Sequence, residues 1–558
     1  MAQLVVSADA DGDILVCPEG LSFWGGVDPA NGCIIDAHHA LHGQSLAGRI
    51  VLMPTSRGSC SGSGVLLELA LNGHAPAALI FCEDEGILTL GAVIASTMFG
   101  RPVGIIRLSR ADYDDLKTQD HAQISGNKLT AGEFSLALQT LSSADLKLTD
   151  SDQAMLDGAK GKAVRLAMET ICTMGAVQGA TRLIDVSRGH IDGCIYAGPA
   201  YLTFAETMAQ MGAQVCIPTT MNAISVVHDS WQEQGVPPIF GQPAARLADA
   251  YVQMGARPNF TCAPYLDADA PQLGENIGWS ESNAVIFANT ALGARTAKHA
   301  DFLDLFIALT GRAPLADVYL AENRIARTEI KVDLPEGYDD ALWPLLGYLA
   351  GKISSGHIPL ITGLEETNPS LDDQRAVCAA FGTTSAAPML HIAGVTPEGN
   401  NAAAPDAEIA HITRADFAEA WAQFNSGPAR VDLIALGSPH FSLKETRQFA
   451  ELMAGKTKHP DTSVMITLGR DTLAIARKEG LVSQLEEAGV HLIHDLCWCS
   501  ITEPVFPPEA KTLMTNSGKY AHYAPGLCGR EVRFGSLSDC AQVAVSGTAT
   551  RELPDWLR

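Results

Sequence analysis

The sequence contains no C-x-x-C pair, although 13 of its 558 residues are cysteines. This absence excludes the ligand spacing of zinc fingers and ferredoxins. The cysteines are also too widely spaced for the disulfide framework of a small secreted domain. We therefore expect reduced thiols, or metal ligands that distant segments of the chain bring together.

Long hydrophobic runs and positive charge are scarce as well. No segment of ~18 residues lacks polar interruption, and the opening stretch MAQLVVSADADGDILV shows no basic region followed by an apolar one. Lysine and arginine number 38 against 63 acidic residues, for a net charge of −25. Such a surface repels nucleic-acid phosphates. We expect a cytoplasmic protein with no membrane or nucleic-acid partner, in which a few converging cations bind any anionic substrate.

The length of the chain exceeds what one hydrophobic core supports, so several packed units are expected. Short β-branched runs alternate with helical patterns from one end to the other, which predicts an α/β fold throughout. The alternation of strand-like and helical patterns is interrupted by a polar stretch, residues 121–147. We therefore predict a first domain over residues 1–145 and a larger, multi-lobed α/β part over residues 146–558.

Three local predictions follow from the pattern beyond this boundary. A long helix is expected to open at LTDSDQAMLDG, with Thr149 or Asp150 as its N-cap. The apolar run AVIFANT, residues 284–290, is typical of a buried strand. The segment TPEGNNAAAPDAE, residues 396–408, is expected to be a loop between two lobes.

The stretch PTSRGSCSGSGVLLELALNG, residues 54–73, gathers Arg57, Ser59, Cys60 and Ser61 ahead of an apolar helical run. The G-x-C-x-G order of residues 58–62 fits a cysteine nucleophile on a strand-to-helix turn. A plain helix entry with serine caps is the simplest interpretation of such a stretch alone. The third interpretation is an anion cradle, because free amides at a helix N-terminus beside an arginine attract negative charge.

Other polar residues stand in apolar surroundings, in the segments YAGPAY, TTMNAISVVHDSW, NTALGARTAKHAD and TNSGKYAHY. In the second, Asn222, Ser225 and His228 are three apart, the spacing of one helical face. Taken singly, each segment is most simply a loop or a solvated helix start. Cysteines in TCAPYL and DLCWCS, taken singly, are most simply buried packing.

Taken together, these segments resemble aconitase X, in the form whose small and large subunits are fused. The first domain is similar to the small-subunit swivel domain through GRIVLMPTSRGSCSGSGVLLELALNG, and the rest to the large subunit through GHIDGCIYAG, MNAISVVHDSW, CAPYL, GWSESNAVIFANTALGART, LGSPHFS and TNSGKYAHY. The resemblance implies a multidomain aconitase-superfamily architecture, and an iron–sulfur hydro-lyase that needs no separate small subunit. The resemblance to fused members implies dehydration of cis-3-hydroxy-L-proline to Δ1-pyrroline-2-carboxylate. The resemblance to two-subunit archaeal members implies phosphomevalonate as the alternative substrate.

The resemblance also implies roles for single residues. Ser59 is the first choice for the catalytic base and Ser61 the second, with Arg57 beside them. The residues that would bind a carboxylate substrate are the turn at Gly198 and the side chains of Asn222, Ser225, Arg295, Thr296 and Lys519. Cys262 and Cys497 match cluster ligands.

The third ligand is expected in a G-C-P-H segment, but residues 437–440 are Gly-Ser-Pro-His. Serine oxygen is a harder and rarely ionised donor, so it binds iron less readily than thiolate does. We therefore favour a 2Fe–2S cluster, with Cys499 the nearest candidate for the third ligand and Cys378 or Cys60 weaker ones. A 4Fe–4S cluster is the alternative.

Two functions of other classes stay open at this point. A cysteine hydrolase would use Cys60 and would be colourless, whereas an iron–sulfur dehydratase would be brown and oxygen-sensitive. A non-catalytic iron–sulfur sensor would bind RNA, which the acidic composition disfavours.

Overall fold

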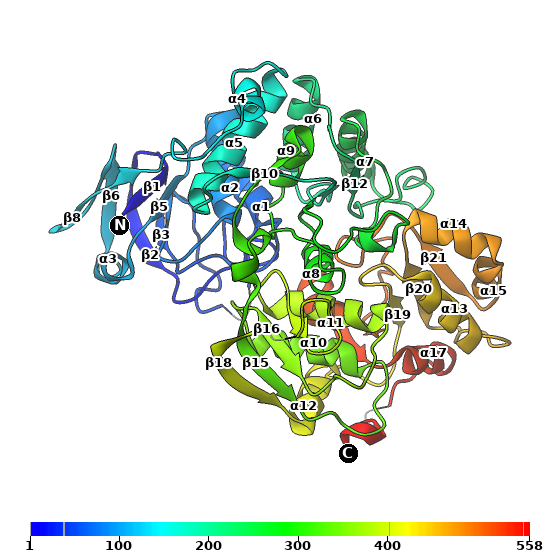
Figure 1. Cartoon of the computed structure of the whole chain (residues 1–558). Coiled ribbons are helices and arrows are strands. Elements are labelled where there is room, and N and C mark those ends of the chain that lie inside the picture. The colour runs from blue at the N-terminus through cyan, green and yellow to red at the C-terminus, as the bar shows by residue number, and fades with distance from the viewer. Residues whose placement is uncertain (1, 37–38, 401, 551) are drawn as a thin grey trace.

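A computed structural model of the chain describes residues 2–36, 39–400, 402–550 and 552–558. Its N-terminal unit is a nine-stranded mixed sheet, coloured blue to cyan in Figure 1. The strand order is β8-β7-β6-β2-β3-β4-β5-β1-β9. The strands are β1 (Gln3–Val6), β2 (Ala10–Val16), β3 (Ile50–Leu52), β4 (Ala78–Phe81), β5 (Gly104–Arg107), β6 (His121–Ser125), β7 (Lys128–Ala131), β8 (Phe134–Ala137) and β9 (Gln139–Thr140).

Central strands β3 and β4 are buried at every position and pair in parallel. Their continuous apolar sequences, IVL and ALIF, are what a parallel strand covered on both faces requires. The helices of this unit are α1 (Gly62–Asn72), α2 (Ile87–Phe99) and α3 (Arg110–Leu116). The turn of residues 53–61 leaves the carboxyl end of β3 and enters α1, which is the edge where open α/β sheets bind ligands.

The larger part contains four further sheets among the described residues. Next to the N-terminal unit lie a two-stranded and a three-stranded sheet, made of β10 (Leu183–Asp185), β14 (Arg312–Pro314), β11 (Gly189–Ile191), β12 (Thr219–Met221) and β13 (Gly278–Trp279). The helices around them are α4 (Asp150–Leu156), α5 (Lys162–Val177), α6 (Pro199–Gln210), α7 (Pro238–Gln253), α8 (Ser282–Thr290) and α9 (Leu303–Thr310).

Two parallel sheets form the rest. The four-stranded sheet has the order β17-β16-β15-β18 and the five-stranded sheet the order β21-β20-β19-β22-β23. Their strands are β15 (Ala326–Val332), β16 (Pro359–Thr362), β17 (His391–Ile392), β18 (Ala403–Ile412), β19 (Leu433–Leu436), β20 (Ser463–Thr467), β21 (Val490–Ile493), β22 (Thr512–Thr515) and β23 (Glu531–Phe534). Their helices are α10 (Leu342–Ile353), α11 (Leu371–Thr384), α12 (Arg414–Phe424), α13 (Leu443–Leu452), α14 (Arg470–Lys478), α15 (Leu481–Glu487), α16 (Gly518–Cys528) and α17 (Leu537–Ser546).

The sequence predicts the α/β class correctly but misplaces three local features. Thr149 does cap a helix, through a capping box with Asp152, yet the expected long helix is two helices, α4 and α5, separated at residues 157–161. AVIFANT is not a strand but helix α8, because a short apolar run is equally compatible with a fully buried helix. Residues 403–408, expected to be a loop, begin edge strand β18, where Pro405 is tolerated.

The N-terminal unit packs against the following one through a shared hydrophobic core. One cluster of buried side chains runs from Val6 to Tyr319 and draws on both units. The Tyr201 hydroxyl donates to the Ser61 carbonyl oxygen at 2.9 Å, and the Ala200 amide donates to Glu68 Oε2 at 2.6 Å. A Cβ on Gly64 would lie 2.0 Å from the Tyr201 ring, so only glycine permits this close contact. None of the described helices is long and apolar enough to cross a membrane.

Candidate active site

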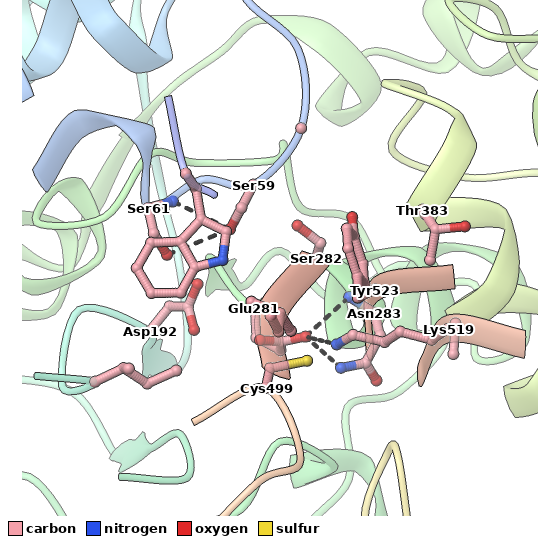
Figure 2. Close-up of a pocket in the computed structure, with 16 residues that line it drawn as sticks. Ser59, Ser61, Asp192, Glu281, Ser282, Asn283, Thr383, Cys499, Lys519 and Tyr523 are labelled. Carbon is pink, nitrogen blue, oxygen red and sulfur yellow. Dashed lines mark hydrogen bonds and ion pairs between the residues drawn. The ribbon is translucent and has the colours of Figure 1, made fainter. Parts of the chain in front are cut away.

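A pocket of about 60 Å³ lies where the N-terminal unit meets the larger part (Figure 2). Residues from both sides line it. The N-terminal unit contributes Trp24, Gly58, Ser59 and Ser61. The larger part contributes Asp192, Ile195, Glu281, Ser282, Asn283, Ala379, Gly382, Thr383, Cys499, Lys519, Tyr523 and Leu527. A ligand in this pocket would therefore contact segments far apart in the sequence.

The serine turn brings two hydroxyls together at the start of α1. Ser59 Oγ donates to Ser61 Oγ at 3.3 Å, and it accepts from the Ser61 backbone amide at the same distance. Gly58, with φ of +90°, makes the turn possible, because a side chain there would be strained and would collide with Ser22. An amide aimed at Ser59 Oγ favours negative charge on that oxygen.

Across the pocket, Glu281 is the centre of a buried polar network (Figure 2). Lys519 Nζ lies 3.1 Å from Glu281 Oε1, and Asn222 Nδ2 donates to Glu281 Oε2 at 2.9 Å. Burial raises the pKa of Glu281, but the Lys519 ammonium outweighs this and holds it below its usual range. Asn222 also donates to Asp192 and so joins the two carboxylates that line the pocket.

Three thiols converge near Glu281. Cys497 hydrogen-bonds with both Cys262 and Cys499, and these bonds hold the pKa of the Cys497 thiol well below its ordinary value. The His440 amide donates to Cys262 Sγ at 3.4 Å, and the Lys519 charge acts on all three sulfurs. Burial and the neighbouring Cys497 raise the pKa of the Cys262 and Cys499 thiols well above their ordinary value. Three converging sulfurs beside a lysine ammonium are the soft donors that iron–sulfur clusters use, so this donor set fits a cluster. Within the described ranges, no three His, Cys, Asp or Glu side chains form a single-ion site.

A second network fixes the segment that carries two of these thiols. Arg470 donates two hydrogen bonds to the Asp495 carboxylate, at 2.6 and 2.7 Å, and the His228 amide donates a third at 3.1 Å. Burial raises the pKa of Asp495, but the hydrogen bonds from Arg470 and His494 outweigh it and lower the pKa to about 2. Asp495 thus anchors the turn that begins two residues before Cys497.

The structure brings together some of the residues that the sequence singled out. Ser59, Ser61, Cys499 and Lys519 line the pocket. Asn222, Cys262 and Cys497 lie buried in the networks just behind it. The Asn222–His228 stretch is not the helical turn expected from its spacing, since residues 222–228 are irregular.

Five of the expected residues have other surroundings, and none lines the pocket. Arg57 forms ion pairs with Glu19 and Asp36 at the surface. The cation at the serine turn is Lys298 instead, whose Nζ donates to the Gly58 carbonyl oxygen at 3.3 Å. The others have structural contacts: Gly198 packs on Glu68, Ser225 accepts from the Tyr196 amide, Arg295 donates to the Tyr319 carbonyl, and Thr296 accepts from the Trp279 amide.

Cys60 does not fit a nucleophile. Its side chain is fully buried, and burial raises the pKa of the thiol far above its ordinary value. Its sulfur lies 3.8 Å from the hydroxyl oxygen of Ser282, which is no general base. A nucleophilic cysteine needs a lowered pKa, so the hydrolase interpretation loses its support.

Sequence reasoning missed Asp192, Glu281, Lys298 and Asp301. All four stand inside segments that carried the resemblance or next to them, but no spacing rule marks them. Asp192 follows buried strand β11 and Glu281 caps α8 by accepting from the Asn283 amide at 3.3 Å. A carboxylate placed directly after an apolar strand was the available signal.

Comparisons with known proteins agree with this architecture. Profiles of the aconitase X swivel, first, second and third domains match residues 1–131, 145–322, 326–422 and 431–546. This set of domains is that of a hydro-lyase of the aconitase superfamily. Within that class, the chain belongs to the aconitase X family.

Three similar proteins define its place in the family. The cis-3-hydroxy-L-proline dehydratase of Pseudomonas aeruginosa is 48% identical over 99% of this chain and 97% of its own. The phosphomevalonate dehydratase large subunit of Methanocaldococcus jannaschii is 32% identical over 70% of this chain and 98% of its own. The crystal structure of Thermococcus kodakaraensis aconitase X in its holo-form is 30% identical, with a TM-score of 0.64, and covers 72% of this chain and 100% of its own.

Proposed function

We propose that the chain dehydrates cis-3-hydroxy-L-proline to Δ1-pyrroline-2-carboxylate. The observation that carries this proposal is the meeting, at one interdomain pocket, of a serine pair, a Lys519–Glu281 pair and Cys499. Cys262 and Cys497 converge on Cys499 just behind the pocket. The near-full-length similarity to a dehydratase of that substrate supports it. We also propose that residues 1–145 form the swivel domain and residues 146–558 the catalytic part.

The charges of the pocket favour an amino acid over a phosphorylated substrate. Of the described residues that line it, Lys519 is the one cation, while Asp192 and Glu281 are carboxylic. A hydroxyproline zwitterion needs one cation for its carboxylate and an acceptor for its ring ammonium. A phosphomonoester carries about −1.5 to −2 charges and needs more cations than this pocket offers. Phosphomevalonate is therefore the weaker candidate.

Residues at the pocket have roles in binding the substrate or in removing its α-proton. Lys519 holds the substrate carboxylate, with Asn222 keeping Glu281 and Asp192 in place beside it. Ser59 Oγ takes the α-proton of the substrate, and the Ser61 amide stabilises negative charge on that oxygen. Trp24 and Tyr523 help to exclude water from the pocket. Loss of the proton and of the 3-hydroxyl gives an enamine, which tautomerises to the product.

Cys262, Cys497 and Cys499 would hold the iron–sulfur cluster. Dehydratases of the aconitase family generally use such clusters, and when bound the cluster supplies an iron that acts as a Lewis acid toward a departing hydroxyl. Ser438 stands where the resemblance implies a third cysteine, and its buried hydroxyl has no hydrogen bond to any described residue. We propose a 2Fe–2S cluster, because position 438 holds a serine and, among the described residues, Cys499 is the one soft donor packed beside Cys262 and Cys497.

The activity is tested by an anaerobic assay of the purified protein with cis-3-hydroxy-L-proline, its trans isomer and phosphomevalonate. We expect turnover of the first alone. Ser59→Ala should lower kcat ~10²–10⁴-fold while the iron content stays that of the wild type, since a base is lost and no thiol is touched. Full activity of Ser59→Ala with an inactive Ser61→Ala would move the base to Ser61.

The cluster is tested separately by iron and sulfide analysis with Mössbauer spectra on anaerobically purified protein. Two irons per chain are expected, and Cys497→Ala should lose them. Cys528→Ala is a matched control, because Cys528 bonds to Ala524 and Tyr520 and stands apart from the three thiols. A four-iron cluster in the active enzyme, or full iron loading of a Cys262→Ala/Cys497→Ala double variant, contradicts the assignment.

A further inference from the structure

A buried aspartate lies directly behind the serine turn. Asp301 is 1% exposed, and neither of its carboxyl oxygens has a hydrogen bond of standard geometry to a described residue. Its backbone is bound to the turn on both sides: the Asp301 amide donates to the Cys60 carbonyl at 3.3 Å, and Ser63 Oγ donates to the Asp301 carbonyl at 3.2 Å. The carboxyl group is therefore held at the turn without a structural bond of its own.

Polar side chains connect this carboxyl group to the pocket. Ser59 Oγ donates to Ser61 Oγ at 3.3 Å. The Ser61 hydroxyl and the Asp192 carboxyl are polar neighbours that lower the pKa of the Asp301 carboxyl, although neither has standard hydrogen-bond geometry to it. Ser59, Ser61 and Asp192 all line the pocket, whereas Asp301 does not (Figure 2). Ser61 and Asp192 are therefore the proton-exchanging neighbours through which the surroundings of Asp301 connect with the pocket.

We propose that Asp301 is the proton acceptor behind Ser59, reached through Ser61, an inference that rests on the proposed dehydration. When the Cα–H bond of the substrate breaks, its proton passes to Ser59 Oγ. The Ser59 proton moves to Ser61 Oγ, and the Ser61 proton moves to the Asp301 carboxylate. The C–H electron pair forms the C=C bond as the C3–O bond breaks and hydroxide departs. Asp301 becomes neutral, and its proton returns to the pocket through Asp192, where it completes the departing water.

This arrangement explains how a serine of ordinary acidity acts as a base. A free alkoxide is not required, because the charge that is neutralised is that of a carboxylate. Burial and the neighbouring Asp304 raise the pKa of Asp301 to about 8, so the group exchanges protons near neutral pH. The titratable groups that face it are Asp192, Asp304, Glu281, Cys60, Cys194, Tyr201 and Tyr251.

Asp301 acts through the serines and touches no reacting atom, so it is a positioning residue and its test needs more than a loss of activity. The full-length holoenzyme is assayed as wild type, Asp301→Asn and Asp301→Glu, with kcat/KM followed from pH 5 to pH 10. A substrate deuterated at the α-carbon reports proton abstraction. Asp340→Asn is the matched control: Asp340 is a buried aspartate with its pKa raised to about 6, and it accepts from the Leu537 amide, which asparagine also allows.

We expect Asp301→Asn to lower kcat ~10²–10³-fold, with KM and iron content close to wild type and a larger deuterium effect. The wild-type rise of kcat/KM toward alkaline pH should vanish in Asp301→Asn and return in Asp301→Glu. Asp340→Asn should keep the wild-type profile. If Asp301→Asn does not fold, Ser61→Ala cuts the same path and should also lose the rise.

Two results would overturn the inference. One is a folded Asp301→Asn enzyme with wild-type kcat and pH profile, or an unfolded one accompanied by a Ser61→Ala enzyme that keeps the profile. The other is a wild-type protein that does not dehydrate hydroxyproline at all. The second result rejects the proposed function together with the inference, whereas the first leaves the proposed function standing.

Discussion

Replacing Gly64 by alanine should disturb the contact on which the pocket depends. The new Cβ would lie 2.0 Å from Tyr201 Cζ and 2.1 Å from its hydroxyl oxygen. Carbon atoms normally approach to about 3.5–4.0 Å, so the ring or helix α1 must move by ~1.5 Å. Tyr201 is 1% exposed and packs on Phe302, with ring centroids 5.4 Å apart, so the ring has no room to move.

The cost has two parts. Overpacking a well-filled core costs about 1–3 kcal/mol, and the Tyr201–Ser61 hydrogen bond contributes about 0.5–1.5 kcal/mol more. We expect Gly64→Ala to lower the free energy of unfolding by roughly 2–4 kcal/mol. Activity should fall as well, up to about 100-fold, because Ser61 shifts with the helix that follows it and carries Ser59 along.

Urea denaturation and a double-mutant cycle measure this effect. The Gly64→Ala/Tyr201→Ala variant should be more stable than the sum of the single variants predicts, by about 0.5–3 kcal/mol, because the second change removes the atoms that clash. Gly526→Ala is the control, since Gly526 is itself exposed and no atom lies within 4 Å of its added Cβ. Wild-type stability and activity of Gly64→Ala, or additive effects in the cycle, would refute the reasoning.

Two further substitutions probe the buried charges. Asp495→Asn should lower the free energy of unfolding by about 1.5–3 kcal/mol at pH 7 and should lower the iron content, because it removes the charge-assisted hydrogen bonds from Arg470 that anchor the cysteine turn. In urea denaturation, the difference from wild type should shrink as the pH falls toward 2, because wild-type Asp495 is itself protonated there. Asp301→Asn should be more stable than wild type at pH 8 and about equally stable at pH 4. The reason is that the pKa of Asp301 is raised in the folded protein, so the wild type loses stability as the pH rises from about 4 to about 8. Equal urea midpoints of the two proteins at both pH values would contradict this.

The α/β class could be predicted because strand and helix periods are local properties of the sequence. Strand β4 and helix α6 are legible in ALIF and YLTFAETMAQ without any partner. Helix α8 could not be predicted from its sequence, since every residue from Asn283 to Thr290 is buried and a fully buried helix shows no amphipathic period.

The site could be predicted only in part for a related reason. Ser59 and Ser61 stand in a conspicuous turn, whereas Asp301 is an ordinary aspartate in its own segment and becomes significant only because folding places it behind that turn. Arg57 and Lys298 also show that the sequence alone does not reveal which side chains folding brings to the serine turn. The nearer cation in sequence points to surface carboxylates, and the one that reaches the turn comes from 240 residues away.

The shared hydrophobic core between the N-terminal unit and its neighbour bears on how the enzyme assembles. In a two-subunit relative, the matching interface must form by encounter of two chains, and its occupancy depends on their concentrations. Here one continuous chain supplies both halves of the core, so closure is intramolecular, at an effective concentration in the millimolar range for a short linker. Dilution therefore leaves the pocket assembled, and the two halves are always produced in equal number.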